Sequence, residues 1–361
     1  MTTIDTKLAS VAAAVRPARR KVFLGLTVLL VLSAILSLAI GPTGVSLQAL
    51  PRAFAASFGF ANDAAAERDR LVLIDLRLPR ILLAAFVGAA LATSGAMMQG
   101  LFRNPLADPG LIGVSSGAGL AAVATIALGH GVAAPIVAPL GIYALPLSAF
   151  FGGIVTTLFL VAIAGRRGQL AIGTLLLAGI AVGAFAGSIS SFIAYASDDR
   201  ELRDLTLWSL GSLSGASWDK VFAVAPFALA MALLIPRLTR GLNGFLFGEA
   251  EAMHLGIDTE RTKRIAVAAT AAAVGAAVAV AGIIGFVGLV VPHFIRLISG
   301  PDNRVVLPGS ALLGAVLVIG ADIVARMVLA PAELPLGIVL AIVGAPVFLH
   351  LVLKRGIGGW E

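Results

Sequence analysis

The 361-residue chain has no cysteine, which excludes a disulfide framework and any thiolate metal site or nucleophile. Charged residues are also scarce. They make up 12% of the chain, against about a quarter in soluble globular proteins. Hydrophobic residues account for 59%, and the mean hydropathy is +1.02. This composition predicts an all-α integral membrane protein, a single transmembrane domain over residues 1–361 embedded in the lipid bilayer.

A nucleotide-binding motif is missing as well. A phosphate-binding loop requires G-x-x-x-x-G-K-[ST], but the five lysines are followed by Leu, Val, Val, Arg and Arg. The chain therefore does not hydrolyse ATP by that route. The four histidines show no metal-ligand spacing, and we predict no metal site, no bound cofactor and no catalytic residue. The net charge of +7 is typical of cytoplasmic loops that face anionic headgroups, so we expect no nucleic-acid partner.

Ten apolar runs predict ten transmembrane helices. The first follows the polar segment 1–21 and is longer than a signal-peptide core of about 7–15 residues, so we predict a span with a cytoplasmic N-terminus. With both termini inside, most lysines and arginines face the cytoplasm, as the positive-inside rule requires. Residues 41–70 then lie outside and residues 241–258 inside. The predicted spans are 22–40, 78–101, 111–128, 142–164, 170–194, 221–235, 265–281, 282–298, 307–329 and 336–353.

An internal repeat predicts how these spans are related. The pattern V-G-A-A-x-A-x-x-G occurs at 87–95 and at 274–282, and Pro105 and Pro292 follow the two copies at the same distance. Five spans separate the copies, so they run in opposite directions, as in the inverted-topology repeats of many transporters. The alternative is coincidence between helices that are rich in alanine and glycine.

Residues 241–258 are too polar to cross a bilayer and too apolar for a solvated loop. We predict two short helices, 242–247 and 249–255, broken at Gly248, because glycine commonly ends a helix. The segment carries large apolar side chains that a loop does not need, and we interpret it as a docking surface for another protein. Those side chains are Phe245, Leu246, Phe247, Met253 and Leu255.

Polar features within the spans are few. Asp322 and Arg326 are four residues apart and can pair on one helical face. We interpret them as a structural pair, with a proton relay as the alternative. Few other carboxylates lie within spans, which leaves little for an ion-coupled carrier and favours energy supplied by a separate subunit. In the fifth span, small residues predict either close helix packing or a face that lines a wide pathway. These residues are Gly179, Gly183, Gly187, Ser188, Ser190 and Ser191.

Several motifs closely resemble one family, the permeases of ATP-binding-cassette importers for iron-siderophores, haem and vitamin B12. The resemblance implies a type II ABC importer permease fold and a homodimer in the bacterial inner membrane. It also implies two cytoplasmic ATPase subunits that bind ATP-Mg, and a periplasmic substrate-binding protein. The motifs are LRLPR (76–80), GAMMQGLFRNPLADPG (95–110), GVSSGA (113–118), GFVGLVVPH (285–293), ADIVAR (321–326) and AELPLGI (332–338).

The same resemblance assigns roles to individual residues. It implies a coupling helix that contacts the ATPase, formed by Glu249, Ala250, Glu251, Ala252, Met253, His254 and Leu255. It implies arginines that bind glutamates of the binding protein, namely Arg77, Arg80 and Arg326. The fifth span and the segment after it would line the translocation pathway, through Gly179, Gly183, Gly187, Ser188, Ser191, Arg200, Arg203 and Trp208.

The cargo follows from one stretch, SDDRELRDLTLWSLGSLSG (197–215), which most resembles haem permeases. Arg200 or Arg203 could attract the carboxylates of haem, although both could be ordinary surface charges. The alternatives are a ferric-siderophore or vitamin B12 permease. A secondary transporter driven by an ion gradient and an intramembrane enzyme are more distant alternatives.

Overall fold

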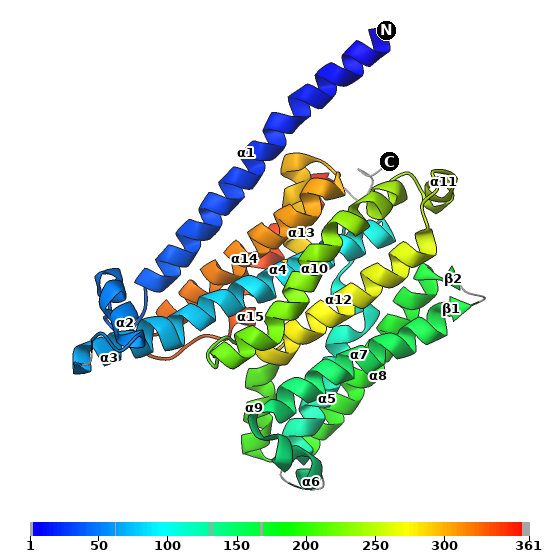
Figure 1. Cartoon of the computed structure of the whole chain (residues 1–361). Coiled ribbons are helices and arrows are strands. Elements are labelled where there is room, and N and C mark those ends of the chain that lie inside the picture. The colour runs from blue at the N-terminus through cyan, green and yellow to red at the C-terminus, as the bar shows by residue number, and fades with distance from the viewer. Residues whose placement is uncertain (1–2, 62, 130, 132, 167–168, 356–361) are drawn as a thin grey trace.

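The computed structural model describes residues 3–61, 63–129, 131, 133–166 and 169–355. A helix occupies each of the ten predicted spans (Figure 1). Seven are long and apolar enough to cross a membrane, and α5, α13 and the stretch Leu336–His350 of α15 are shorter apolar segments among the described residues. The ten are α1 (Thr3–Ala39), α4 (Leu78–Phe102), α5 (Val114–Leu128), α7 (Ala144–Ala164), α8 (Ile172–Ala196), α10 (Trp218–Phe245), α12 (Thr259–Ala281), α13 (Val287–Ser299), α14 (Asn303–Met327) and α15 (Leu336–Arg355).

Short elements connect these helices. The predicted outer segment 41–70 contains two short α-helices and a 3-10 turn, and it continues through a π-helical stretch into α4. The connecting elements are η1 (Leu47–Ala49), α2 (Leu50–Ser57), α3 (Ala64–Arg70), η2 (Leu71–Arg77), η3 (Pro109–Ile112), α6 (Ala134–Val137), η4 (Ala138–Tyr143), α9 (Asp199–Ser209) and α11 (Glu249–His254). The strands β1 (Gly165–Arg166) and β2 (Gln169–Leu170) form an antiparallel hairpin between α7 and α8.

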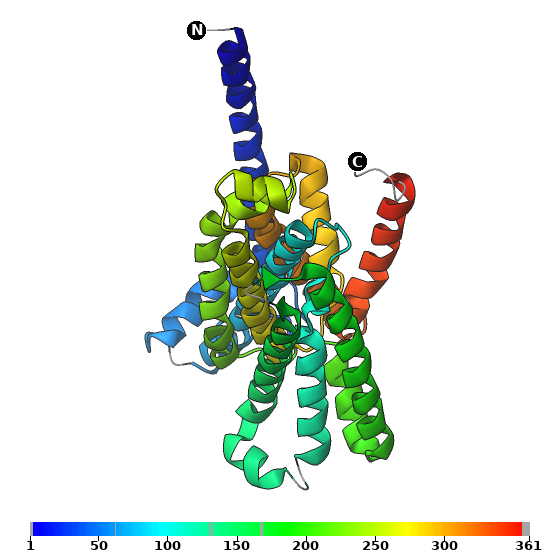
Figure 2. The same cartoon turned by 90° about the vertical axis from the view of Figure 1, so that its right-hand side faces the viewer.

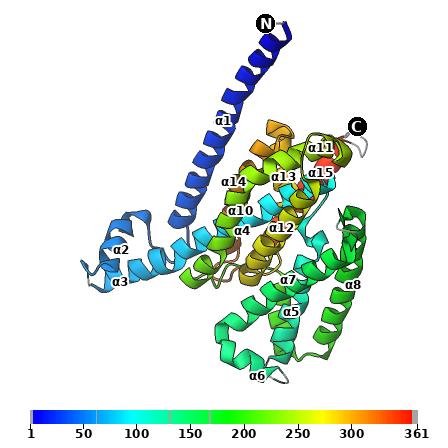
Figure 3. The ribbon, with the colours of Figure 1, turned by 45° about the vertical axis from the view of Figure 1, so that its right-hand side comes forward.

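Helix α4 is the centre of the bundle. It packs against α14, α10, α12 and α13 (Figures 1 and 3), and 78% of its most apolar window is buried, against 6% for α1 and 17% for α8. Small residues permit this close packing. A Cβ on Gly88 would lie 2.2 Å from the carbonyl oxygen of Gly314 on α14, so the two backbones touch without side chains between them.

The loops lie at two opposite ends of the bundle. We call the end that carries α11 the α11 end, and the end that carries α3 the α3 end. At the α11 end, Asp302 at the start of α14 binds Arg19 of α1 and Asn243 of α10. Burial alone would raise the pKa of Asp302, but the Arg304 amide, Asn243 and the charge of Arg19 hold it below its ordinary value. The end of α15 lies at this same end (Figure 2). At the α3 end, Trp218 donates to the Ile74 carbonyl at 3.2 Å.

The two repeat copies lie on α4 and α12, which pack together and run in opposite directions (Figure 1). The local structures of the copies differ, however. Gly95 lies inside α4, whereas Gly282 ends α12 with a φ of 71°. Pro105 lies in a turn after α4, and Pro292 lies inside α13. The predicted start of the eighth span at residue 282 was therefore five residues too early.

The prediction of two short helices within 241–258 was wrong for the first of them. Helix α10 continues without a break to Phe245, so residues 242–245 form its last turn. Leu242 and Phe245 are buried there and pack in the core, which is why the helix does not end earlier. The break at Gly248 is confirmed, because this glycine has a φ of 118°, a backbone conformation that residues with a side chain rarely adopt.

Candidate functional site

The short helix α11 has an anchored face and an exposed face. Ala252 is fully buried on the anchored face, where it lies beside Gly244 near the end of α10. On the other face Met253 is 55% exposed, and Leu255, just after the helix, is 60% exposed. Large apolar side chains held out from the body of a protein favour a contact with a partner. Ala250, Glu251 and His254 are exposed on the same short helix.

Glu249, the first residue of α11, turns back toward the bundle. Its carboxylate pairs with the ammonium group of Lys263 on α12, whose side chain is only 4% exposed. Lys263 also pairs with Glu260 at 2.8 Å. The same ammonium donates to the carbonyl of Leu170 in strand β2 at 3.3 Å. This cluster joins α11, α12 and the hairpin, and the sequence reasoning did not identify it.

At the α3 end, Arg77, Arg80 and Arg326 line one pocket of about 190 Å³. The structure therefore brings together the three arginines that the sequence suggested for docking. Arg80 contacts Glu333 through two hydrogen bonds of 2.8 and 2.9 Å. Its guanidinium also pairs with Asp322 at 2.9 Å.

All three arginines have partners within the chain, and none is freely exposed. Arg326 pairs with Asp322 at 3.0 Å, which confirms the predicted i,i+4 pair, and it donates to the Ser37 hydroxyl of α1 at 2.8 Å. Arg77 donates to the Thr43 hydroxyl at 2.8 Å. The side chains of Arg80 and Arg326 are 12% and 5% exposed, and Arg77 is 5% exposed as a residue. The sequence did not indicate that Glu333 and Asp322 would share Arg80.

The pathway residues predicted on α8 divide into two groups. A Cβ on Gly179 would lie 1.9 Å from the Leu111 carbonyl oxygen, so this glycine serves close packing against η3. At Gly183 the corresponding contact is the Ser116 hydroxyl at 3.2 Å. Farther along the helix the small residues are uncovered: Gly187, Ser188 and Ser191 are exposed.

Helix α9 follows α8 directly and carries the remaining pathway residues. Its start is fixed by a capping box in which Asp198 and Glu201 exchange hydrogen bonds. Arg200 and Arg203 are exposed, and Trp208 is half-buried. The exposed face of α8 thus leads toward two exposed arginines at the far end of the bundle from α11.

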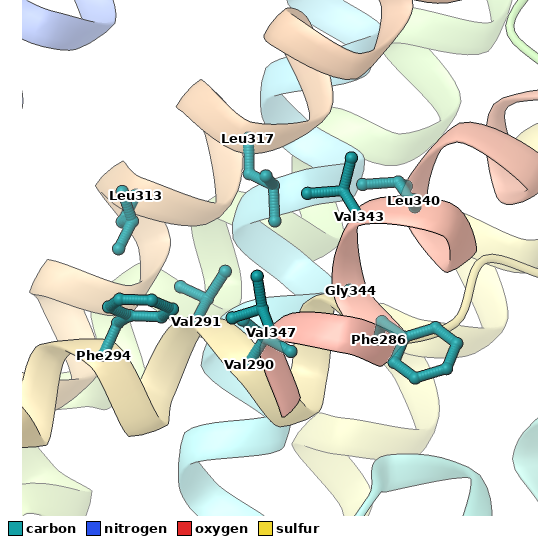
Figure 4. A pocket seen from close by; sticks show the side chains of 10 residues that line it. All are labelled: Phe286, Val290, Val291, Phe294, Leu313, Leu317, Leu340, Val343, Gly344 and Val347. Carbon is teal, nitrogen blue, oxygen red and sulfur yellow. The ribbon is translucent and has the colours of Figure 1, made fainter. Parts of the chain in front are cut away.

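A separate cavity of about 270 Å³ lies between α13, α14 and α15 (Figure 4). Its lining consists of apolar residues, among them Phe286, Phe294 and Leu317. Ligand sites for polar cargo carry a few placed polar groups that fix orientation. This cavity provides no such side chain, and it is not a candidate for recognition of a charged chelate.

Comparison with known proteins places this arrangement in a family. The model of the FecCD transport family matches residues 29–354. The chain belongs to the FecCD transport family. It is 42% identical to the cobalamin import system permease protein of Halobacterium salinarum over 86% of this chain and 80% of that protein. It is 41% identical to the hemin transport system permease protein of Yersinia pestis over 79% of this chain and 84% of that protein.

A solved structure shares the fold over nearly the whole chain. It is an inward-facing conformation of an ABC transporter assigned to the metal-chelate type, with a TM-score of 0.80 and 31% identity over 93% of this chain and 99% of that one. The FecCD chain described here therefore has the type II ABC importer permease fold. It is a multi-pass permease subunit of an ABC importer, and the ATPase is a separate subunit.

Proposed function

We propose that two copies of this FecCD permease form the translocation pathway of an importer that carries haem from the periplasm to the cytoplasm. The exposed face of α8, with Ser188 and Ser191, would line the path between the copies. Arg200 and Arg203 at its outer end carry the cargo assignment, because exposed guanidinium groups bind carboxylates through paired hydrogen bonds. A relative at 41% identity is named as a hemin permease.

The same proposal places the α11 end in the cytoplasm and the α3 end outside. The exposed side chains of Met253 and Leu255 would enter a cleft of the ATPase subunit. At the outer end, the pocket lined by Arg77, Arg80 and Arg326 would receive acidic side chains of the binding protein. These three arginines outnumber Asp322 and Glu333, so the pocket keeps a net positive charge that suits an acidic partner.

A corrinoid is the second candidate cargo, because two relatives at 42% identity are named as cobalamin or vitamin B12 permeases. Corrinoids carry mostly amides at their periphery, whereas haem carries two carboxylates. The two cargoes should therefore differ in their dependence on the arginines of α9. Arg68 offers a matched control, since it is an exposed arginine at the same end of the bundle.

Uptake into proteoliposomes tests this proposal, with the ATPase and binding-protein subunits of the complex reconstituted alongside the permease. We expect ATP-dependent uptake of haem in preference to cyanocobalamin or a ferric siderophore. Replacing both Arg200 and Arg203 by glutamine should reduce haem uptake at least about tenfold, because one charged hydrogen bond contributes about 1.5–3 kcal/mol and about 1.4 kcal/mol is a factor of ten. Arg68→Gln should leave uptake unchanged. Preferential uptake of cyanocobalamin, with no effect of the α9 substitutions, would assign the corrinoid instead.

A further inference from the structure

Strand β2 ends at Leu170, two residues before α8 begins, and both backbone polar groups of Leu170 are held by side chains of α12. The Leu170 amide donates to Glu260 at 2.8 Å, and its carbonyl accepts from Lys263 at 3.3 Å. Glu260 and Lys263 are themselves paired at 2.8 Å. The start of α8 is thus attached to the first turn of α12 through one residue, whose side chain is buried as well.

Lys263 also binds Glu249 of α11. An ammonium group with so little exposed surface requires compensating partners, because an unpaired buried charge is strongly unfavourable. It therefore cannot move away from Glu249 without losing one of its two neutralising carboxylates. Lys263 thus contacts α11 on one side and the Leu170 carbonyl on the other.

We propose that Lys263 is a positioning residue that transmits displacement of α11 to the start of α8. This inference rests on the proposed function, in which α11 enters a cleft of the ATPase subunit and α8 lines the pathway, and it takes the ATPase cycle to displace α11. A shift of Glu249 would pull the ammonium group, alter its contact with Leu170 and reorient the residues that lead into α8. The route crosses three elements through side-chain contacts, rather than following the chain from α11 back through α10.

A purely structural role makes a different prediction. In that case Glu260 alone would hold Lys263 in place, and loss of the Glu249 carboxylate would leave the motion of α8 unchanged. Glu249→Gln separates these possibilities, because Glu249 is 44% exposed and its loss leaves the contacts among Lys263, Glu260 and Leu170 in place. Arg261→Gln is the control, since Arg261 is an exposed cation of the same helix turn.

The absence of cysteine permits single spin labels without background. One label is placed on α11 through Ala250→Cys and, in a separate protein, one in the first turn of α8 through Thr174→Cys, both at exposed positions. The complete complex in nanodiscs is then compared without nucleotide and with ATP and vanadate. The distance between equivalent labels in the two copies is measured by double electron–electron resonance, together with the ATP hydrolysed per cargo molecule transported.

In the otherwise unaltered protein, we expect nucleotide to shift the distances at both labels. In Glu249→Gln the shift at position 250 should persist, most of the shift at position 174 should be lost, and more ATP should be consumed per transported molecule. Arg261→Gln should behave like the unaltered protein. A full shift at position 174 in Glu249→Gln would overturn the proposed role of Lys263 and leave the proposed coupling role of α11 intact. No shift at position 250 in the unaltered protein would overturn the proposed coupling role of α11, and this inference with it.

Discussion

Replacing Asp322 by asparagine tests the buried ion-pair network at the α3 end. The Asp322 side chain is 2% exposed and is shared by Arg80 and Arg326. Asparagine has nearly the same shape but no charge, so two guanidinium groups would remain side by side with less compensation. Removing one partner of a buried pair costs about 3–5 kcal/mol. Because Arg80 keeps Glu333, we expect a loss near the lower limit, about 3 kcal/mol.

The measurement is the free energy of unfolding of the purified permease in micelles, from reversible denaturant titration. Asp204→Asn is the control, since Asp204 is exposed on α9, and it should change stability by no more than about 0.5 kcal/mol. Combining Asp322→Asn with Arg326→Gln should cost less than the sum of the two single changes, because the unpaired guanidinium is then gone. A loss below about 1 kcal/mol, the range of exposed pairs, would refute this reasoning. If Asp322 were a proton relay, the permease would take up cargo on a proton gradient without the ATPase, and folded Asp322→Asn protein would lose that uptake.

Two further predictions each compare a helical glycine that lies against another backbone with a helical glycine that has open space beside it. Gly88→Ala should destabilise the permease by about 1–3 kcal/mol, because the new methyl group overlaps the backbone of α14. Gly320→Ala on α14, where a Cβ meets nothing within 4 Å, should stabilise the helix by up to about 1 kcal/mol. Equal Tm values for the Gly88→Ala and Gly320→Ala variants would contradict the close contact between α4 and α14. Along α8, Gly179→Ala should lower Tm. Gly187→Ala should not, because a Cβ on Gly187 also meets nothing within 4 Å. The opposite order of Tm values would refute the assignment of Gly179 to packing.

The helices could be predicted from the sequence because bilayer thickness imposes long apolar runs, and the motifs then predicted the family. Helix ends were less predictable. Residues 242–245 were predicted to be helical, but as a separate short helix; α10 instead runs through them without a break because Leu242 and Phe245 enter the core, a tertiary effect that local sequence does not encode. The eighth helix starts at Val287 rather than at residue 282 because Gly282, with a φ of 71°, ends α12, and the residues after it connect α12 to α13 without helical structure.

Side-chain partners were the least predictable part of the site. Asp322 and Arg326 pair within one helix, so their spacing was sufficient. The partner of Arg80, Glu333, lies 253 residues away along the chain, and no local pattern indicates such a contact. Lys263 appeared in the sequence only as one positive charge among several in a loop. Its spacing of three residues from Glu260 was the single available sign of a pair.

The central position of α4 also constrains how the permease is made. The four helices that enclose α4 all follow it in the chain: α10, α12, α13 and α14. During synthesis α4 enters the bilayer before any of them exists, with Thr93, Ser94 and Gln99, all buried in the finished protein, still facing lipid or the insertion machinery. Assembly must therefore proceed by later helices closing around an early one, and a ribosome that stops before α10 leaves α4 without its neighbours.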